Sequence, residues 1–159
     1  MLRLVEDLDL RKYSDFVYIS ASDDVYSAQK FRERSKDAKV TVTLESIHRS
    51  RHVGQSWTSS LFTTFISILW CFPLVWKHKA DLLLVNGPGT CVPLVWITGI
   101  LNMLRLRSCR IVFIESICRV ETLSLSAKLS LPFLDALLVQ WPELYASYPH
   151  TSTYIGRLV

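Results

Sequence analysis

The sequence predicts an α/β protein with a Rossmann-like parallel sheet and helices on both faces, and three observations lead to this prediction. Short runs of β-branched and apolar residues alternate along the chain with segments of helical period. Some runs, such as DLLLVN at residues 81–86, are continuously apolar, as is typical of parallel strands covered on both faces. No internal repeat or low-complexity linker interrupts the 159 residues. We therefore expect residues 1–159 to form a single domain.

The first half of the chain contains two expected strands. Leucine and valine recur at helical spacing in residues 2–8, and residues 15–21 (DFVYISA) have the composition of a strand. Ser22 or Asp23 can cap the helix that follows. Residues 40–44 (VTVTL) return to extended propensity, so the order is helix, strand, helix, strand.

The second half continues this alternation. Strands are expected at residues 81–86, 110–115, 135–140 and 153–155, and helices at residues 91–104, 122–133 and 141–148. Trp141 before Pro142 resembles a helix start packed by its aromatic ring, with a plain core residue as the alternative.

Residues 53–76 carry no charge and have one apolar helical face. That face consists of Phe62, Phe65, Leu69, Phe72 and Trp76. The length would allow a membrane span of about 20 residues. Six Ser and Thr residues between positions 58 and 67, together with the internal Pro73, instead favour a packed helix or one docked at a membrane interface. Residues 77–79 (KHK) would then lie at the phosphate headgroups.

Composition limits the classes of partner. Half of the residues are hydrophobic and the mean hydropathy is +0.25, so part of the surface is expected to meet a membrane or another protein. The net charge of +4 includes no dense basic run, and nucleic acid is not expected as a partner. The four cysteines form no CxxC pair and the four histidines have no ligand spacing, so we expect reduced thiols, no metal and no cofactor.

The first distinctive stretch is NGPGT, where the strand at residues 81–86 leads into a helix. Gly87 and Gly89 allow backbone geometry and close approach that a side chain would block, and Pro88 stiffens the turn. Amides at a helix N-terminus favour a phosphate or diphosphate, and Thr90 can cap the helix or bond a phosphate oxygen. A tight turn without a ligand is the alternative, and it stays open.

The second stretch, ESICRVETLS, follows the next predicted strand and lies on the same rim, where open parallel sheets bind ligands. Glu115 could bond a sugar hydroxyl or serve as a base, and Arg119 could meet a phosphate. Alternatively, Glu115 or Glu121 pairs with Arg119, and Thr122 or Ser124 caps the next helix.

Long ordered stretches resemble a known family. LLLVNGPGTCVP, IVFIESICRVETLSLSAKL, DALLVQWPEL and YIGRLV closely resemble, in order, the C-terminal two-thirds of the asparagine-linked glycosylation anchor subunit. That subunit belongs to the eukaryotic UDP-N-acetylglucosamine (UDP-GlcNAc) transferase complex. The resemblance covers residues 1–159. More distantly, the chain resembles the N-terminal half of the bacterial enzyme that attaches N-acetylglucosamine to a polyprenyl-diphosphate sugar, an enzyme of GT-B fold.

The resemblance implies the acceptor-side half of a split GT-B glycosyltransferase, a non-autonomous subunit in dolichol-linked oligosaccharide synthesis for protein N-glycosylation. It implies that the chain holds a dolichyl-diphosphate-GlcNAc acceptor and recruits a soluble UDP-GlcNAc-binding catalytic subunit. The second GlcNAc would be added in the cleft between them. The implied location is the cytosolic face of the endoplasmic reticulum membrane, with the nuclear envelope as a further location.

The family motif also implies site residues. On the acceptor side of the cleft these are Asn86, Gly87, Pro88, Gly89, Thr90, Glu115, Ser116, Arg119, Glu121 and Thr122. Glu115 is the candidate catalytic residue. The segment expected to contact the partner consists of Tyr154, Ile155, Gly156, Arg157, Leu158 and Val159.

The start of the chain departs from the family. Members begin with a membrane-spanning helix, a strand and a Gly-Gly-His-Thr loop, whereas residue 1 here resembles a position inside the helix that follows. We therefore expect the anchor and first strand to be missing, with impaired catalysis and an exposed sheet position.

Two other classes of function are open to the sequence. One is a freestanding Rossmann-like nucleotide-binding enzyme, although the chain has no GxGxxG and no P-loop lysine. The other is a small membrane protein built on the two charge-free runs, residues 53–76 and the helix expected at residues 91–104.

Overall fold

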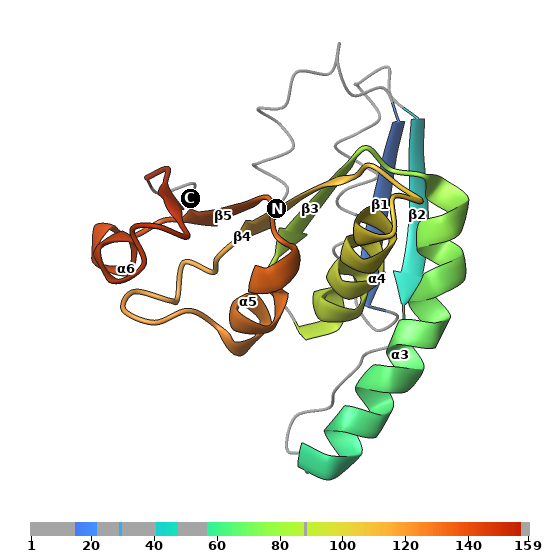
Figure 1. Ribbon diagram of the computed structural model, residues 1–159, viewed down its shortest axis with the longest axis horizontal. Coiled ribbons are helices and arrows are strands. Elements are labelled where there is room, and N and C mark those ends of the chain that lie inside the picture. Colours follow the sequence, from blue (N-terminus) through green and yellow to red (C-terminus); the bar gives the residue numbers. More distant parts are fainter. Residues whose placement is uncertain (1–14, 22–28, 30–40, 48–56, 88, 157–159) are drawn as a thin grey trace. The chain divides into compact units, whose positions relative to one another are not determined.

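The computed structural model describes residues 15–21, 29, 41–47, 57–87 and 89–156, with the backbone alone for residues 21 and 57–65. The chain divides into two compact units, Met1–Arg49 and Ser50–Val159, and each is described by itself. Figure 1 traces the elements along the sequence. The helices expected at residues 2–8 and after Ser22 lie outside the described residues. The expectation of a single domain stays a prediction.

The first unit contains a pair of parallel strands. β1 (Asp15–Ala21) has the expected bounds, and β2 (Thr41–Ile47) begins one residue later and ends three residues later than expected. The two strands pair in register from Asp15 with Thr41 to Ala21 with Ile47. Their β-branched and aromatic residues suit this half-buried pleated surface.

The second unit is built on a sheet of four parallel strands. These are β3 (Leu82–Asn86), β4 (Arg110–Ile114), β5 (Ala136–Val139) and β6 (Thr153–Tyr154), in the order β3-β4-β5-β6. Each strand pairs in parallel with its neighbour, and a helix lies between successive strands in the sequence. The predicted α/β, Rossmann-like class is therefore confirmed.

The helices of this unit differ in detail from the prediction. They are α3 (Trp57–His78), α4 (Val92–Met103) after the short helix η1 (Gly89–Cys91), α5 (Leu125–Ser130) continued by η2 (Leu131–Phe133), and α6 (Pro142–Ser147). The helix expected from residue 122 begins only at Leu125, because residues 116–123 form a loop. It tightens into a 3₁₀ turn where Pro132 has no N–H to donate.

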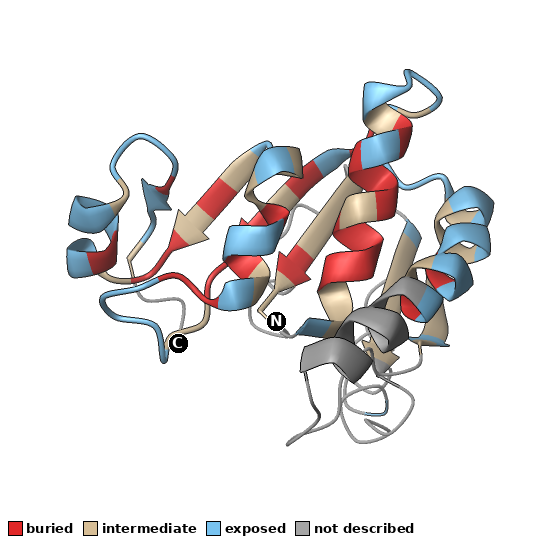
Figure 2. Cartoon of the chain, turned by 60° about the horizontal axis from the view of Figure 1, so that its bottom comes forward, coloured by how far each residue is buried: buried red, intermediate tan, exposed pale blue. Residues whose placement is uncertain are grey.

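The core lies between the sheet and the helices α4, α5 and α6. Its buried side chains form one cluster: Val85, Val95, Ile111, Phe113, Leu123, Ala127, Leu137, Val139 and Leu144. Figure 2 shows this buried band along the strands and along α4. Gly99 of α4 permits close approach to η2, because a methyl group added there would lie 2.6 Å from Cβ of Phe133. Trp96 donates its indole N–H to the carbonyl of Leu129 (3.0 Å) and so ties α4 to α5.

The described part of the charge-free run, residues 57–76, is helical as expected and belongs to α3. α3 packs against α4, and its buried described side chains are Ser67 and Cys71. Leu69, Phe72 and Trp76, expected on one apolar face, are exposed. Within the described part of the chain, no helix is both long and apolar enough to cross a membrane.

Candidate functional site

The two distinctive stretches meet at one edge of the four-stranded sheet. Asn86 at the end of β3 pairs in register with Ile114 at the end of β4, so the segments that follow leave the sheet side by side. Between them is an open pocket of about 390 Å³. It is lined by Asn86, Gly87, Glu115, Ser116, Arg119, Ser124, Leu125 and Ser126. The shared rim was predicted from the sequence, whereas the contribution of Leu125 and Ser126 was not.

The turn after β3 needs glycine at its first position. Gly87 has φ +69°, in the left-handed region that other residues rarely adopt. A methyl group added there would lie 3.9 Å from Cβ of Ser116, and one added at Gly89 would lie 3.9 Å from Oγ of Ser126. The turn therefore passes close to the start of the 115–124 loop, meaning residues 115–124 between β4 and α5, and to the first turn of α5.

Gly89 and Thr90 of NGPGT do not line this pocket. Thr90 belongs to η1, and the N-cap residue of α4 is Cys91, which makes no side-chain cap. Thr90 therefore does not cap α4, which was one of its two predicted roles. Pro88 lies outside the described residues. The first residues of α5 complete the pocket in place of the N-terminus of α4.

Glu115 holds the 115–124 loop closed. Its side chain is fully buried at 0% exposure, and its two carboxylate oxygens accept from different backbone amides. Oε1 accepts from Ser116 (2.8 Å), and Oε2 accepts from Ser124 (2.8 Å). Charged acceptors make strong hydrogen bonds when buried. Both ends of the loop are therefore tied to one side chain.

The same loop is supported by Gln140 and Trp141, which directly follow β5. Gln140 donates its side-chain amide to the carbonyl of Glu115 (2.9 Å), and Trp141 donates its indole N–H to the carbonyl of Ile117 (2.7 Å). Trp141 also packs against the core, as its plain interpretation held. The sequence signal for these roles was their position at the carboxyl end of the neighbouring parallel strand.

Arg119 is an exposed cation on the pocket wall. Its backbone amide donates to the carbonyl of Ser116 (3.0 Å), so a tight turn sets its position. In the described part of the chain, no ion pair joins Arg119 to Glu115 or to Glu121, so the predicted alternative of such a pair is wrong. The competing prediction that Ser124 caps the next helix is confirmed, because its Oγ accepts from the amide of Ala127 (3.1 Å).

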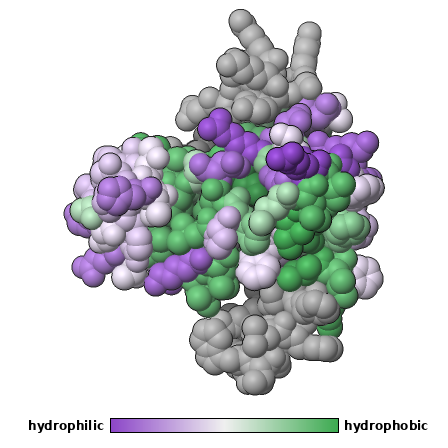
Figure 3. All heavy atoms as spheres, viewed as in Figure 1, coloured by the Kyte–Doolittle hydropathy of each residue, from purple (hydrophilic) through white to green (hydrophobic). Residues whose placement is uncertain are grey.

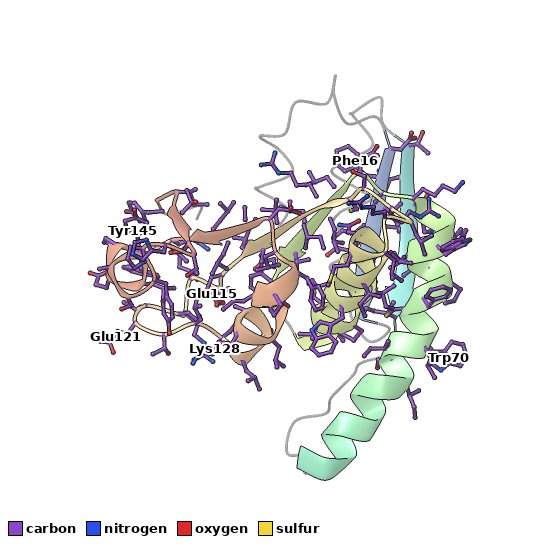
Figure 4. The ribbon with its side chains drawn as sticks, in the orientation of Figure 1. Phe16, Trp70, Glu115, Glu121, Lys128 and Tyr145 are labelled. Carbon is purple, nitrogen blue, oxygen red and sulfur yellow. The ribbon has the colours of Figure 1, made fainter. Side chains whose placement is uncertain are left out.

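The other predicted site residues that the structure describes do not line the pocket. Glu121 and Thr122 are exposed and do not line it. Figure 4 shows Glu121 on the outer bend of the loop, with Glu115 inside. Tyr154 of β6 and Ile155 are exposed at the far edge strand of the sheet, and Gly156 follows with φ +76°. Arg157, Leu158 and Val159 lie outside the described residues.

Cys71 and Cys109 are buried and Cys91 is half-buried, and the pKa of each thiol is raised. Burial raises the pKa of Cys71 and of Cys109 to about 11, and that of Cys91 to about 12. Cys118, in the 115–124 loop, is exposed. Across the residues that the structure describes, no group of three or more His, Cys, Asp or Glu side chains could hold a metal ion.

The fold and the pocket define a Rossmann-like α/β protein with a polar site at the carboxyl ends of its strands. Residues 1–158 match the family described as "Oligosaccharide biosynthesis protein Alg14 like", and the chain belongs to this family.

Curated relatives agree with this family. The chain is 46% identical to the "UDP-N-acetylglucosamine transferase subunit ALG14" of Mus musculus, over 100% of this chain and 76% of that protein. It is 43% identical to the proteins of the same name from Yarrowia lipolytica and Homo sapiens, again over 100% of this chain and over 74% and 76% of theirs. No solved structure matches the chain.

Proposed function

We propose that this chain is the acceptor-side subunit of a UDP-GlcNAc transferase that acts in dolichol-linked oligosaccharide synthesis. Family membership and the names of the relatives support the transferase assignment. The observation that carries the acceptor-side role is the pocket at the ends of β3 and β4, where ligands of open parallel sheets bind.

The lining of the pocket suits a sugar diphosphate. Arg119 supplies a permanent positive charge for a phosphate oxygen, and the hydroxyls of Ser116 and Ser126 can bond either phosphate or sugar. Asn86 adds a side-chain amide, which both donates and accepts. In this proposal the diphosphate lies beside Arg119, and the acceptor sugar lies toward Asn86.

Glu115 acts in this proposal as a positioning residue. A base must have a free oxygen within hydrogen-bond reach of the proton that it removes. Both carboxylate oxygens of Glu115 already accept hydrogen bonds from backbone amides. This supports a role in holding the 115–124 loop, and Arg119 within it, in place.

The proposal includes a partner and a membrane. A soluble subunit that binds UDP-GlcNAc would complete the cleft and would be recruited through residues 154–159. Exposure of Tyr154 and Ile155 supports this contact, because both are large side chains at the edge of the sheet. The acceptor is a lipid, so the complex would work at the cytosolic face of the endoplasmic reticulum membrane.

A transfer assay with a matched pair of arginine variants tests the proposal. The full chain is co-expressed with its soluble partner, and GlcNAc transfer from UDP-GlcNAc to a GlcNAc-diphosphate-lipid is measured. Arg119→Gln removes one charge-assisted bond worth about 1.5–3 kcal/mol, so kcat/KM for the acceptor should fall roughly 10- to 100-fold. Arg110→Gln serves as the control, since Arg110 is also exposed but lies at the opposite end of β4.

Two results would count against this function. Equal activity of the two variants would remove the pocket from the reaction. Binding of UDP-GlcNAc by the purified chain without its partner would instead favour the freestanding nucleotide-binding enzyme.

A further inference from the structure

The exposed side of α3 is apolar, which is the reverse of an ordinary surface helix. Ser67, a polar residue, is buried on the side that packs against α4. Leu69 and Trp70 on the opposite side are 60% and 73% exposed. Figure 4 shows Trp70 projecting away from α4. Burial of such side chains is strongly favourable, so this face is expected to be covered by something.

This apolar surface continues beyond α3. Its members on α3 are Ile66, Leu69, Trp70, Phe72 and Trp76. The guanidinium of Arg107 lies 4.8 Å from the ring centroid of Trp76 and donates to the carbonyl of that residue (3.0 Å). The segment at the end of α4 is thereby joined to α3, and it exposes Met103, Leu104 and Leu106. We call these eight side chains the α3–α4 surface.

Positive charges outnumber negative ones at the border of the α3–α4 surface, where Asp81 is an exposed acidic residue just beyond the end of α3. Lys77, Lys79 and Arg105 are exposed where α3 and α4 end, and Arg107 is half-buried beside them. Residues 57–80 and 92–109 contain no Asp or Glu. Figure 3 shows apolar residues over α4 and α3, with hydrophilic residues at the end where both helices stop.

We propose that the α3–α4 surface docks on the headgroup and acyl boundary of an anionic phospholipid bilayer. Tryptophan and phenylalanine beside lysine and arginine form the composition that lies flat in such an interface. Lys79 and Arg105 would meet lipid phosphates, while Leu69 and Trp70 would enter the boundary. The excess of Lys and Arg over the single Asp81 at this border complements the negative charge of an anionic bilayer. The inference deepens the membrane location proposed above and rests on it, but it concerns a surface apart from the pocket.

Vesicle flotation of the full chain tests this docking. The probes are vesicles of phosphatidylcholine alone and of phosphatidylcholine with added phosphatidylserine. Wild type should float with both and more strongly with the anionic vesicles. Leu69→Glu should bind roughly tenfold more weakly or worse, since it places a charge where an apolar side chain would enter the membrane. Leu129→Glu is the matched control, because Leu129 is 44% exposed on α5 and is not part of the α3–α4 surface.

A charge variant tests the cationic border separately. Lys79→Gln combined with Arg105→Gln should reduce binding to the anionic vesicles by roughly 10-fold or more and leave binding to phosphatidylcholine unchanged. Circular dichroism and the thermal midpoint of each variant establish that it is folded.

The outcomes separate docking from catalysis. Equal vesicle binding by Leu69→Glu and Leu129→Glu would overturn the proposal. If Leu69→Glu no longer binds the soluble partner but still binds vesicles, the α3–α4 surface contacts protein and the docking proposal is overturned. Transfer to a detergent-dispersed acceptor should be unchanged in Leu69→Glu. If wild type itself shows no GlcNAc transfer while vesicle binding follows the prediction, the transferase proposal fails and the docking surface stands.

Discussion

At the residue scale, the position of Glu115 makes a sharp prediction. Glu115→Ala leaves the amides of Ser116 and Ser124 without their acceptor, and buried donors that lose a partner cost about 1–3 kcal/mol each. The free energy of unfolding should therefore fall by about 2–4 kcal/mol, as measured by urea denaturation. Glu115→Gln keeps one acceptor oxygen but presents an N–H to the other backbone amide. Its free energy of unfolding should therefore lie between those of wild type and Glu115→Ala.

Kinetics distinguish positioning by Glu115 from general base catalysis. If Glu115 positions the 115–124 loop, Glu115→Gln should mainly raise KM for the acceptor and leave the acid limb of the kcat pH profile in place. Trp141→Phe removes the indole N–H that supports the same loop and should shift KM in the same direction. General base catalysis predicts a different result. In that case Glu115→Gln, but not Trp141→Phe, should lower kcat by orders of magnitude and remove the acid limb of its pH profile.

The cysteines give a second prediction at this scale. Burial raises the pKa of Cys71, Cys91 and Cys109 to about 11 or 12, so these thiols stay protonated from pH 7 to pH 9 as well as being shielded. Cys118 is exposed. Iodoacetamide at pH 8 should therefore label the native chain once, at Cys118, and the urea-unfolded chain at all four cysteines, as read by peptide mass spectrometry. Rapid labelling of Cys71 or Cys109 in the native chain would contradict their burial.

Residue roles in the pocket were only partly predictable from the sequence. The rim position of Glu115, Ser116 and Arg119 followed from strand ends, because parallel strands bring their carboxyl ends together. The hydrogen-bond partners of the Glu115 carboxylate could not be predicted from the sequence, because one of them depends on a loop that returns to Glu115 at Ser124, nine residues later. Spacing alone favoured the nearby Arg119, whereas the folded loop offers two closer amides.

At the element scale, the contact between α4 and η2 depends on Gly99. A methyl group there would lie 2.6 Å from Cβ of Phe133 and would force the helices apart. Overpacking of a core costs about 1–3 kcal/mol, against a gain of about 1 kcal/mol when alanine replaces glycine within a helix. Gly99→Ala should therefore lower the thermal midpoint of unfolding. Gly89→Ala should leave it nearly unchanged, since the nearest atom there is 3.9 Å away.

Periodicity predicted the elements better than their orientation. Strand β1 and the rim turn after β3 came directly from composition, and α3 came from a charge-free run of helical period. Which side of α3 is covered could not be predicted, because an apolar stripe has the same spacing whether it meets a core or a membrane. The late start of α5 was missed because Thr122 and Ser124 are both good caps, and only the tie from Ser124 to Glu115 selects one.

At the scale of the whole second unit, three surfaces occupy different parts of one sheet. The pocket lies at the ends of β3 and β4, α3 packs on α4 beyond it, and β6 forms the last strand at the other end of the order. Figure 1 shows α3 and α6 at opposite ends of this unit. Such an arrangement would let membrane contact, acceptor binding and partner binding be changed one at a time.

Separation-of-function variants test that arrangement. Tyr154→Ala combined with Ile155→Asp should abolish co-purification with the soluble partner, and with it GlcNAc transfer, while vesicle flotation stays at the wild-type level. Leu69→Glu should do the opposite and lose flotation while keeping the partner. Both changes fall on exposed side chains, so neither should lower the thermal midpoint of unfolding by more than a few degrees. If the Tyr154 and Ile155 variant loses vesicle binding as well, the two contacts are not independent, and the edge strand has a wider structural role than the sheet order implies.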